Sequence, residues 1–177
     1  MRVVPTVALA AGLIAAAAVP AAAQDLSGRT DRAAIDGVEF AIGVMDFDLS
    51  GTGLTMPVVG RGAKALTRGL AIEFGVTFAT PEQQFGPSQL LIPEAHLSYA
   101  WRFGRLRPFV SGGGGSAVTW GDAIETSWRL SLSGGGGARF DVSDRLHVLG
   151  EMRLRGLTRN FSGSTAEWLG GFGWAWR

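Results

Sequence analysis

The chain contains no cysteine. It can therefore form no disulfide and carry no lipid on a cysteine, which excludes a disulfide framework and a lipoprotein anchor. Only two histidines are present, His96 and His147, so a metal centre built on imidazole and thiolate has little support. Asp46 and Asp48 could contact a calcium ion, but two acids alone are a weak pattern. We expect neither a metal nor a cofactor.

The chain also lacks an excess of charge of either sign, with 16 Lys and Arg against 15 Asp and Glu. Residues 1–23 hold one of the arginines and no acid, so the remainder would be neutral. A neutral chain offers no electrostatic attraction to nucleic acid, and we expect no such partner. After residue 23 long helical periods are scarce while glycine is abundant, with 27 in all, which indicates an all-β protein.

The first 23 residues have the pattern of a secretory signal peptide. Arg2 precedes an apolar run over 3–19, and Ala21 to Ala23 form a small-residue cleavage site. The alternative is a retained membrane anchor, because about 17 apolar residues is the lower limit for a spanning helix. Pro5 and Pro20 argue against that alternative. The expected divisions are a signal peptide at 1–23, a periplasmic lead-in at 24–35 and one barrel domain at 36–177.

The last strand shows the clearest alternation of side-chain size. Trp168, Phe172, Trp174 and Trp176 share one face, and small residues occupy most of the other, a strand pattern of period two. Seven earlier segments alternate in the same way, although Pro57 interrupts the second. The expected strands are 37–48, 53–62, 68–79, 90–103, 106–118, 126–141, 146–157 and 166–176.

The connections between these strands alternate in length. Those at 63–67, 104–105 and 142–145 are short, and those at 80–89, 119–125 and 158–165 are longer and polar; only the first, near 49–52, breaks the rule. Short turns on one side and long loops on the other are typical of outer-membrane barrels, with the short side periplasmic. The fold class is therefore predicted to be an all-β, eight-stranded, antiparallel up-and-down transmembrane barrel.

Aromatic residues on the apolar face gather at the strand ends, as two membrane-interface girdles would require. The expected girdle residues are Phe78, Trp128 and Trp168 at the outer end and Trp101, Phe103, Phe140, Trp174 and Trp176 at the inner end.

The opposite face carries charges that would share a narrow lumen, where they survive only when paired. We expect an ion network that plugs the barrel, made of Glu39, Glu73, Glu94, Arg102, Arg129, Arg139, Glu151, Arg153 and Arg155. The alternative is a periplasmic lipocalin-like carrier, which shows the same alternation inside out, with apolar side chains around a ligand.

Two stretches, 100–109 and 137–145, resemble the strand–turn–strand units of the small eight-stranded outer-membrane barrels of the OmpA/OmpX type. The resemblance covers about 36–177. It implies a monomer in the outer membrane of a Gram-negative bacterium, in contact with lipid and lipopolysaccharide. It also implies that the assembly machinery recognises the aromatic C-terminal strand, although Arg177 departs from the usual aromatic last residue.

One stretch suggests chemistry. Glu94, His96 and Ser98 lie on one strand face with successive Cα atoms about 7 Å apart, so a carboxylate, a base and a nucleophile could meet. His96-Leu-Ser98 also resembles the His-x-Ser-Asn motif of the lipid A 3-O-deacylases, with His96 as base and Ser98 as nucleophile. However, Tyr99 replaces the Asn, and strand parity points both residues into the lumen. The alternative is two polar residues within the lumen network.

The glycine runs at 112–115 and 134–137 are not phosphate-binding loops, because neither precedes a helix or carries Lys followed by Ser or Thr. The sequence therefore favours a structural or surface-interaction role without enzymatic activity. A lipid A-modifying hydrolase and a lipocalin-like carrier are the alternatives.

Overall fold

The computed structural model describes residues 33–47, 53–83, 86–121, 124–157 and 164–176. The expected signal peptide, most of the lead-in and the first hairpin at 49–52 lie outside the described residues. The barrel belongs to one compact unit, Arg32–Arg177.

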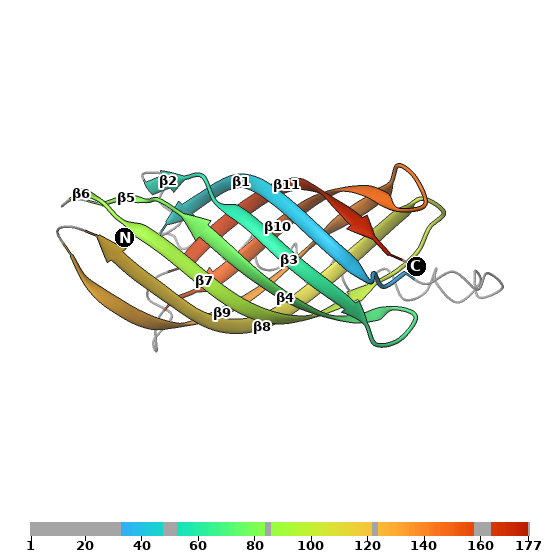
Figure 1. Ribbon diagram of the computed structural model, residues 1–177, viewed down its shortest axis with the longest axis horizontal. Coiled ribbons are helices and arrows are strands. Elements are labelled where there is room, and N and C mark those ends of the chain that lie inside the picture. The colour runs from blue at the N-terminus through green and yellow to red at the C-terminus, as the bar shows by residue number, and fades with distance from the viewer. Residues whose placement is uncertain (1–32, 48–52, 84–85, 122–123, 158–163, 177) are drawn as a thin grey trace, which may run out of the picture. The chain divides into compact units, whose positions relative to one another are not determined.

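Antiparallel strands wind once around the barrel, and the last pairs with the first (Figure 1). Around the barrel the order is β1, β3, β4, β7, β8, β9, β10 and β11, so eight described strands close the wall. Two further short strands, β5 and β6, form a separate hairpin, and β2 pairs with β1 alone. The bounds are β1 Gly37–Phe47, β2 Gly53–Thr55, β3 Val58–Ala65, β4 Leu70–Ala79, β5 Glu82–Gln83, β6 Gly86–Pro87, β7 Gln89–Ala100, β8 Leu106–Gly121, β9 Ile124–Asp141, β10 Leu146–Gly156 and β11 Ser164–Ala175.

The predicted fold class is confirmed, and each barrel strand overlaps its predicted segment. The second segment is divided into β2 and β3 at Met56 and Pro57. Proline has no N–H to donate to a ladder, and here only its carbonyl contributes, accepting a hydrogen bond from the Gly43 N–H at 3.3 Å.

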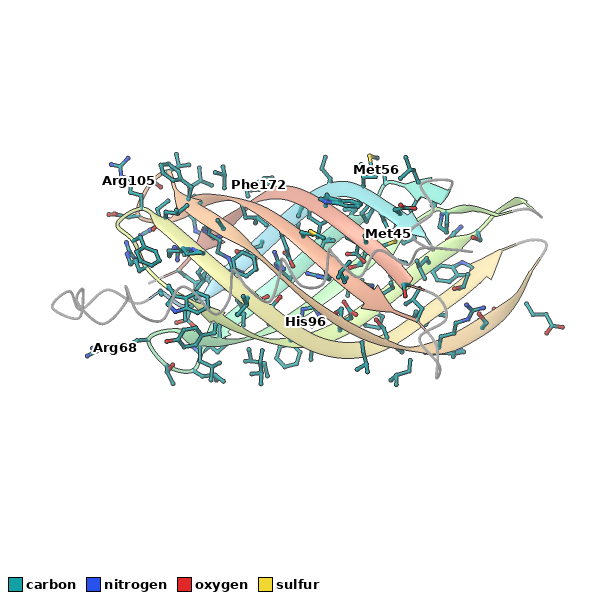
Figure 2. All side chains as sticks on the ribbon, turned by 180° about the vertical axis from the view of Figure 1, so that it is seen from behind. Met45, Met56, Arg68, His96, Arg105 and Phe172 are labelled. Atoms are coloured by element: carbon teal, nitrogen blue, oxygen red, sulfur yellow. The ribbon has the colours of Figure 1, made fainter. Side chains whose placement is uncertain are left out.

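In the barrel strands, the face that the sequence predicts to be apolar points away from the barrel axis. Ile42, at the centre of β1, has 57% of its surface exposed, whereas Glu39 on the opposite face has 1%. Figure 2 shows Phe172 projecting outward from the wall and His96 within it. A lipocalin-like carrier would place its apolar side chains inside, so this arrangement contradicts the carrier alternative.

Among the described residues, no helix is long and apolar enough to cross a membrane.

The expected girdle aromatics lie on the outer face. Phe78, Trp128, Phe140, Trp168, Trp174 and Trp176 are exposed, and Trp101 and Phe103 are half-exposed. Trp168 pairs with Val44 of β1 and Met152 of β10, so it lies further from the strand end than its sequence position suggested.

The two ends of the barrel differ in their connections. The turn end carries the turns at 66–69, 101–105 and 142–145, and the loop end is where β4, β8 and β10 end and β7, β9 and β11 begin. A buried apolar cluster of Met45, Ala79, Leu90, Ile92, Ala117 and Leu157 lies near the loop end. A smaller cluster of Ala33, Ala100 and Phe109 lies near the turn end. The last lead-in residues, Ala33 to Ile35, are therefore buried against the barrel rather than extended in solvent.

Glycines on the lumen face leave room for long side chains from neighbouring strands. At Gly173 an added Cβ would lie 2.3 Å from His147 Nε2 and 2.8 Å from Glu39 Cγ. At Gly170, which faces outward on the same strand, an added Cβ would meet nothing within 4 Å.

This contrast gives a matched pair of variants. We expect Gly173→Ala to lower the free energy of unfolding by about 1–3 kcal/mol, because the new methyl displaces buried charged groups. Gly170→Ala should leave stability unchanged or raise it slightly. Urea titration of the refolded protein in lipid vesicles, followed by gel mobility, would compare them. Equal stability of the two variants would contradict this account of the lumen.

Candidate functional site

The lumen holds a continuous row of alternating carboxylates and guanidinium groups. At the turn-end side, Arg139 donates hydrogen bonds to Glu73 at 2.9 Å and to Glu39 at 2.6 Å. Glu39 also accepts one from Arg61 Nε at 2.6 Å. Arg61 in turn donates through Nη2 to Glu151 at 2.5 Å.

From Glu151 the row continues toward the loop end. Arg153 donates to Glu151 at 2.8 Å and lies 3.5 Å from Glu94. Arg155 donates to Glu94 at 3.0 Å and lies 3.0 Å from Glu167 Oε1. All of these side chains are almost fully buried. Because each charge contacts at least one of opposite sign, the row can exist inside a narrow barrel, where an isolated charge would be very costly.

His147 and Arg107 extend the polar lumen at the turn end. His147 Nε2 lies 2.7 Å from Glu39 Oε1, so the ring shares the carboxylate that two arginines also contact. Arg107 pairs with Asp141, and the Arg139 guanidinium lies 3.9 Å above the Phe109 ring. Such a cation–π contact further satisfies a buried charge.

Two of the expected network residues are placed elsewhere. Arg102 follows the end of β7 and lies 3.4 Å from Asp141 at the turn end, with a third of its side chain exposed. Arg129 has the lumen parity but is exposed, because β9 extends beyond β10 at that level. The parity of a residue predicts which face of the strand it lies on, but not how far along the barrel axis it lies. For this reason the sequence wrongly placed Arg129 in the lumen.

Sequence reasoning missed Arg61, Arg107, His147 and Glu167 as members of the lumen cluster. A signal existed for two of them. Glu167 has the same parity as Leu169 and Gly171, and His147 the same parity as Glu151. Arg61 has the parity opposite to Val58, but Pro57 interrupts that segment and Arg61 was not selected. For Arg107 the facing of the strand was not assigned, because glycine dilutes the segment.

The candidate hydrolase residues lie inside the barrel. His96 and Ser98 are buried, and the hydroxyl beside His96 Nε2 is that of Ser133, at 2.9 Å. Glu94 Oε2 is 3.4 Å from that same nitrogen. A nucleophilic triad needs the carboxylate on Nδ1 and the hydroxyl on Nε2, so this arrangement lacks the required geometry. Glu94 also accepts a hydrogen bond from Ser131 at 2.6 Å, which adds to its role in the lumen network.

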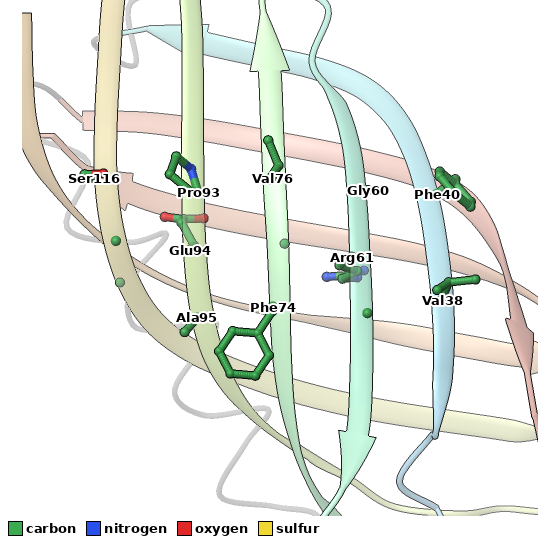
Figure 3. A pocket seen from close by; sticks show the side chains of 14 residues that line it. Val38, Phe40, Gly60, Arg61, Phe74, Val76, Pro93, Glu94, Ala95 and Ser116 are labelled. Atoms are coloured by element: carbon green, nitrogen blue, oxygen red, sulfur yellow. The ribbon is translucent and has the colours of Figure 1, made fainter.

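A shallow depression lies on the outer wall across β1, β3, β4, β7 and β8 (Figure 3), with a volume of about 790 Å³. Small outward residues line it on both sides of Phe74: Gly60 and Gly62 on β3, Ala95 on β7, and Gly114 and Ser116 on β8. The surface there is mostly apolar, as a lipid-facing wall would be.

In the described part of the chain, no group of three or more His, Cys, Asp or Glu side chains is arranged to hold a metal ion.

Comparison with solved structures places this architecture among small outer-membrane barrels. Neisserial surface protein A aligns with a TM-score of 0.67 at 10% identity, over 79% of this chain and 96% of its own. The N-terminal β-barrel domain of Pseudomonas aeruginosa OprF aligns with a TM-score of 0.59 at 14% identity, over 81% and 99%. The outer membrane enzyme PagL aligns with a TM-score of 0.51 at 18% identity, over 77% and 97%.

No protein-family model and no curated protein matches the chain. At these identities the structural likeness establishes the fold alone. The chain has the fold of the small eight-stranded outer-membrane β-barrels, as the sequence resemblance predicted. The structures named above include a surface protein and an enzyme, so the fold does not decide the activity.

Proposed function

We propose that this protein is a monomeric outer-membrane barrel of a Gram-negative bacterium, without enzymatic activity, that acts at the cell surface through its loop end. One observation carries the proposal: above a lumen that contains paired charges, the β8–β9 hairpin projects beyond the described end of β10. The barrel then serves as a rigid, closed support, and the exposed hairpin is the surface available to partners.

The closed lumen is supported by the ion row and by the apolar cluster of Met45, Leu90 and Ile92 near the loop end. An eight-stranded barrel is only wide enough for side chains to fill. Purified protein in planar bilayers is therefore expected to show no steady conductance. Stable open channels in the wild type would contradict the plug.

The hairpin is supported by strand pairing and exposure. Among the described residues, β9 pairs with β10 only from Leu132 onward, so Ile124 to Ser131 pair with β8 alone (Figure 1). Trp128 in this segment has 72% of its surface exposed. A strand that is exposed on its faces and has one edge free of described partners can bind an extended polypeptide.

The orientation can be tested directly because the chain has no native cysteine. Thr126 in the projecting hairpin and Thr67 at the turn end are both exposed. In intact cells, we expect a membrane-impermeant maleimide to label Thr126→Cys and not Thr67→Cys. After permeabilisation of the outer membrane it should label both. Labelling of Thr67→Cys alone in intact cells would invert the proposed orientation.

The same cells test location and the enzymatic alternative. Outer-membrane fractions should contain a band whose gel mobility changes on boiling, and a soluble periplasmic band would overturn the proposal. Lipid A from cells expressing the protein should be unchanged. Altered acylation that is lost in Ser98→Ala or Ser133→Ala would establish a hydrolase instead. Export of the chain by a cleaved signal peptide and recognition of its C-terminal strand by the assembly machinery belong to the same proposal.

A further inference from the structure

Each turn at the turn end presents an exposed arginine. Arg68, Arg105 and Arg145 lie in three successive turns, and Lys64 on the adjoining strand is also exposed. Figure 2 shows Arg68 and Arg105 at the same end of the barrel, pointing away from it. Against these arginines, the three turns contain a single acidic residue, Asp144, which is exposed. The turn end therefore carries a marked excess of positive charge, although the chain as a whole is nearly neutral.

The backbone of these turns is well fixed. In two of them a hydroxyl accepts hydrogen bonds from the amides that follow: Thr67 Oγ1 from Leu70 N–H at 3.1 Å, and Ser143 Oγ from Leu146 N–H at 3.0 Å. In the third, Gly104 adopts φ of 63° before Arg105, as the first central position of a tight two-residue hairpin between Phe103 and Leu106 requires.

The Arg68 turn is also tied to the segment that precedes the barrel. The Arg68 carbonyl accepts hydrogen bonds from Ala33 N–H at 2.8 Å and Ala34 N–H at 3.0 Å. The arginines are thus displayed at set positions around the rim, rather than on long mobile loops.

None of the three arginines forms an ion pair within the described part of the chain, which separates them from the arginines of the lumen. In the lumen, each buried guanidinium contacts a carboxylate of the protein itself. At the turn end the guanidinium groups remain available to an external anion.

The neighbouring aromatics indicate where that anion would be found. Tyr99, Phe140, Trp174 and Trp176 are exposed on the outer wall at this end, and Tyr99 packs against Trp101 with ring centroids 5.0 Å apart. Tyr and Trp rings prefer the headgroup level of a bilayer. Arginines just beyond such a belt of aromatic residues lie at the depth of the lipid phosphates. A guanidinium group can bind a phosphate with two parallel hydrogen bonds.

We propose that the turn end of this barrel binds the phosphate headgroups of anionic phospholipids in the adjacent leaflet, through Arg68, Arg105 and Arg145. A soluble polyanion would be attracted by the same arginines, but it would not require the exposed aromatic residues beside them. An anionic phospholipid therefore fits these observations better. The proposal requires only that the barrel spans a bilayer, so it does not depend on which end faces the periplasm.

The test measures lipid selectivity in reconstituted vesicles. The protein is placed in phosphatidylcholine vesicles containing a small fraction of spin-labelled phosphatidylglycerol or spin-labelled phosphatidylcholine. The motionally restricted fraction of each label gives the relative association of the two lipids. Attraction of a polybasic surface to anionic lipid predicts about a fivefold preference for phosphatidylglycerol in the wild type. Half-molar salt should reduce it, because the contact is exposed and screened.

The variant Arg68→Gln/Arg105→Gln/Arg145→Gln should lower the preference to about unity. Arg129→Gln, which removes an exposed arginine at the loop end, is the matched control and should keep the wild-type preference. The gel mobility shift on boiling verifies that each variant is folded. An undiminished preference in the folded triple variant would overturn the proposal. The proposal would also be overturned if both lipids associated equally with the wild type while the same arginines captured soluble heparin.

Discussion

Replacing Glu39 by alanine is expected to produce the largest loss of stability of any single lumen substitution. Glu39 is the one carboxylate that Arg61, Arg139 and His147 all contact. Removing it leaves two buried guanidinium groups short of a counter-charge, and breaking a buried pair costs about 3–5 kcal/mol. The expected result is a barrel that refolds poorly or unfolds at much lower urea concentration in lipid vesicles.

Two controls make this prediction specific. Glu125→Ala removes an exposed carboxylate from the projecting hairpin and should change the free energy of unfolding by less than about 0.5 kcal/mol. Glu39→Gln retains the size and hydrogen-bonding capacity of the side chain and should fall between the two. If Glu39→Ala were as stable as Glu125→Ala, the ion row would not support the lumen.

Placing a charge on the lipid-facing wall should have the second largest effect. Ile42 is the central residue of β1, points outward and pairs with Val58 and Gly170. Ile42→Arg brings a guanidinium to the middle of the membrane-spanning wall, where an arginine costs about 2–4 kcal/mol in a barrel. We expect a matching drop in the free energy of unfolding in vesicles.

The control for this variant is Val142→Arg. Val142 is also exposed and apolar, but it lies in the turn after β9, outside the spanning part of the strand. The cost there should be about 0–1 kcal/mol, because the depth dependence falls away near the interface. Similar losses for both variants would indicate that water, rather than lipid, surrounds the wall.

The fold was readily predicted from the sequence. Alternation of period two is a local property, because successive side chains of a strand point to opposite faces whatever the rest of the chain does. The segments ending at Ala100, Asp141 and Ala175 were all recognisable for this reason. The class of barrel followed from the lengths of the connections.

The site was predicted only in part. Parity alone assigned Glu39, Glu73, Glu94, Arg139, Glu151, Arg153 and Arg155 to the inner face, and these residues lie there in the structure. It could not show that Arg129 lies above the lumen or that Arg61 joins two glutamates from different strands. Those facts depend on the heights of strands relative to one another.

What the sequence by itself determined is the set of strands and the two faces of each, because both follow from nearest-neighbour backbone geometry. What only the tertiary structure decided is the order of the charges within the lumen and the heights of the strands relative to one another. Glu39 and Arg139 are 100 residues apart in the chain, yet their side chains are 2.6 Å apart. Their meeting depends on the stagger that closes the barrel, which is a property of all the strands together.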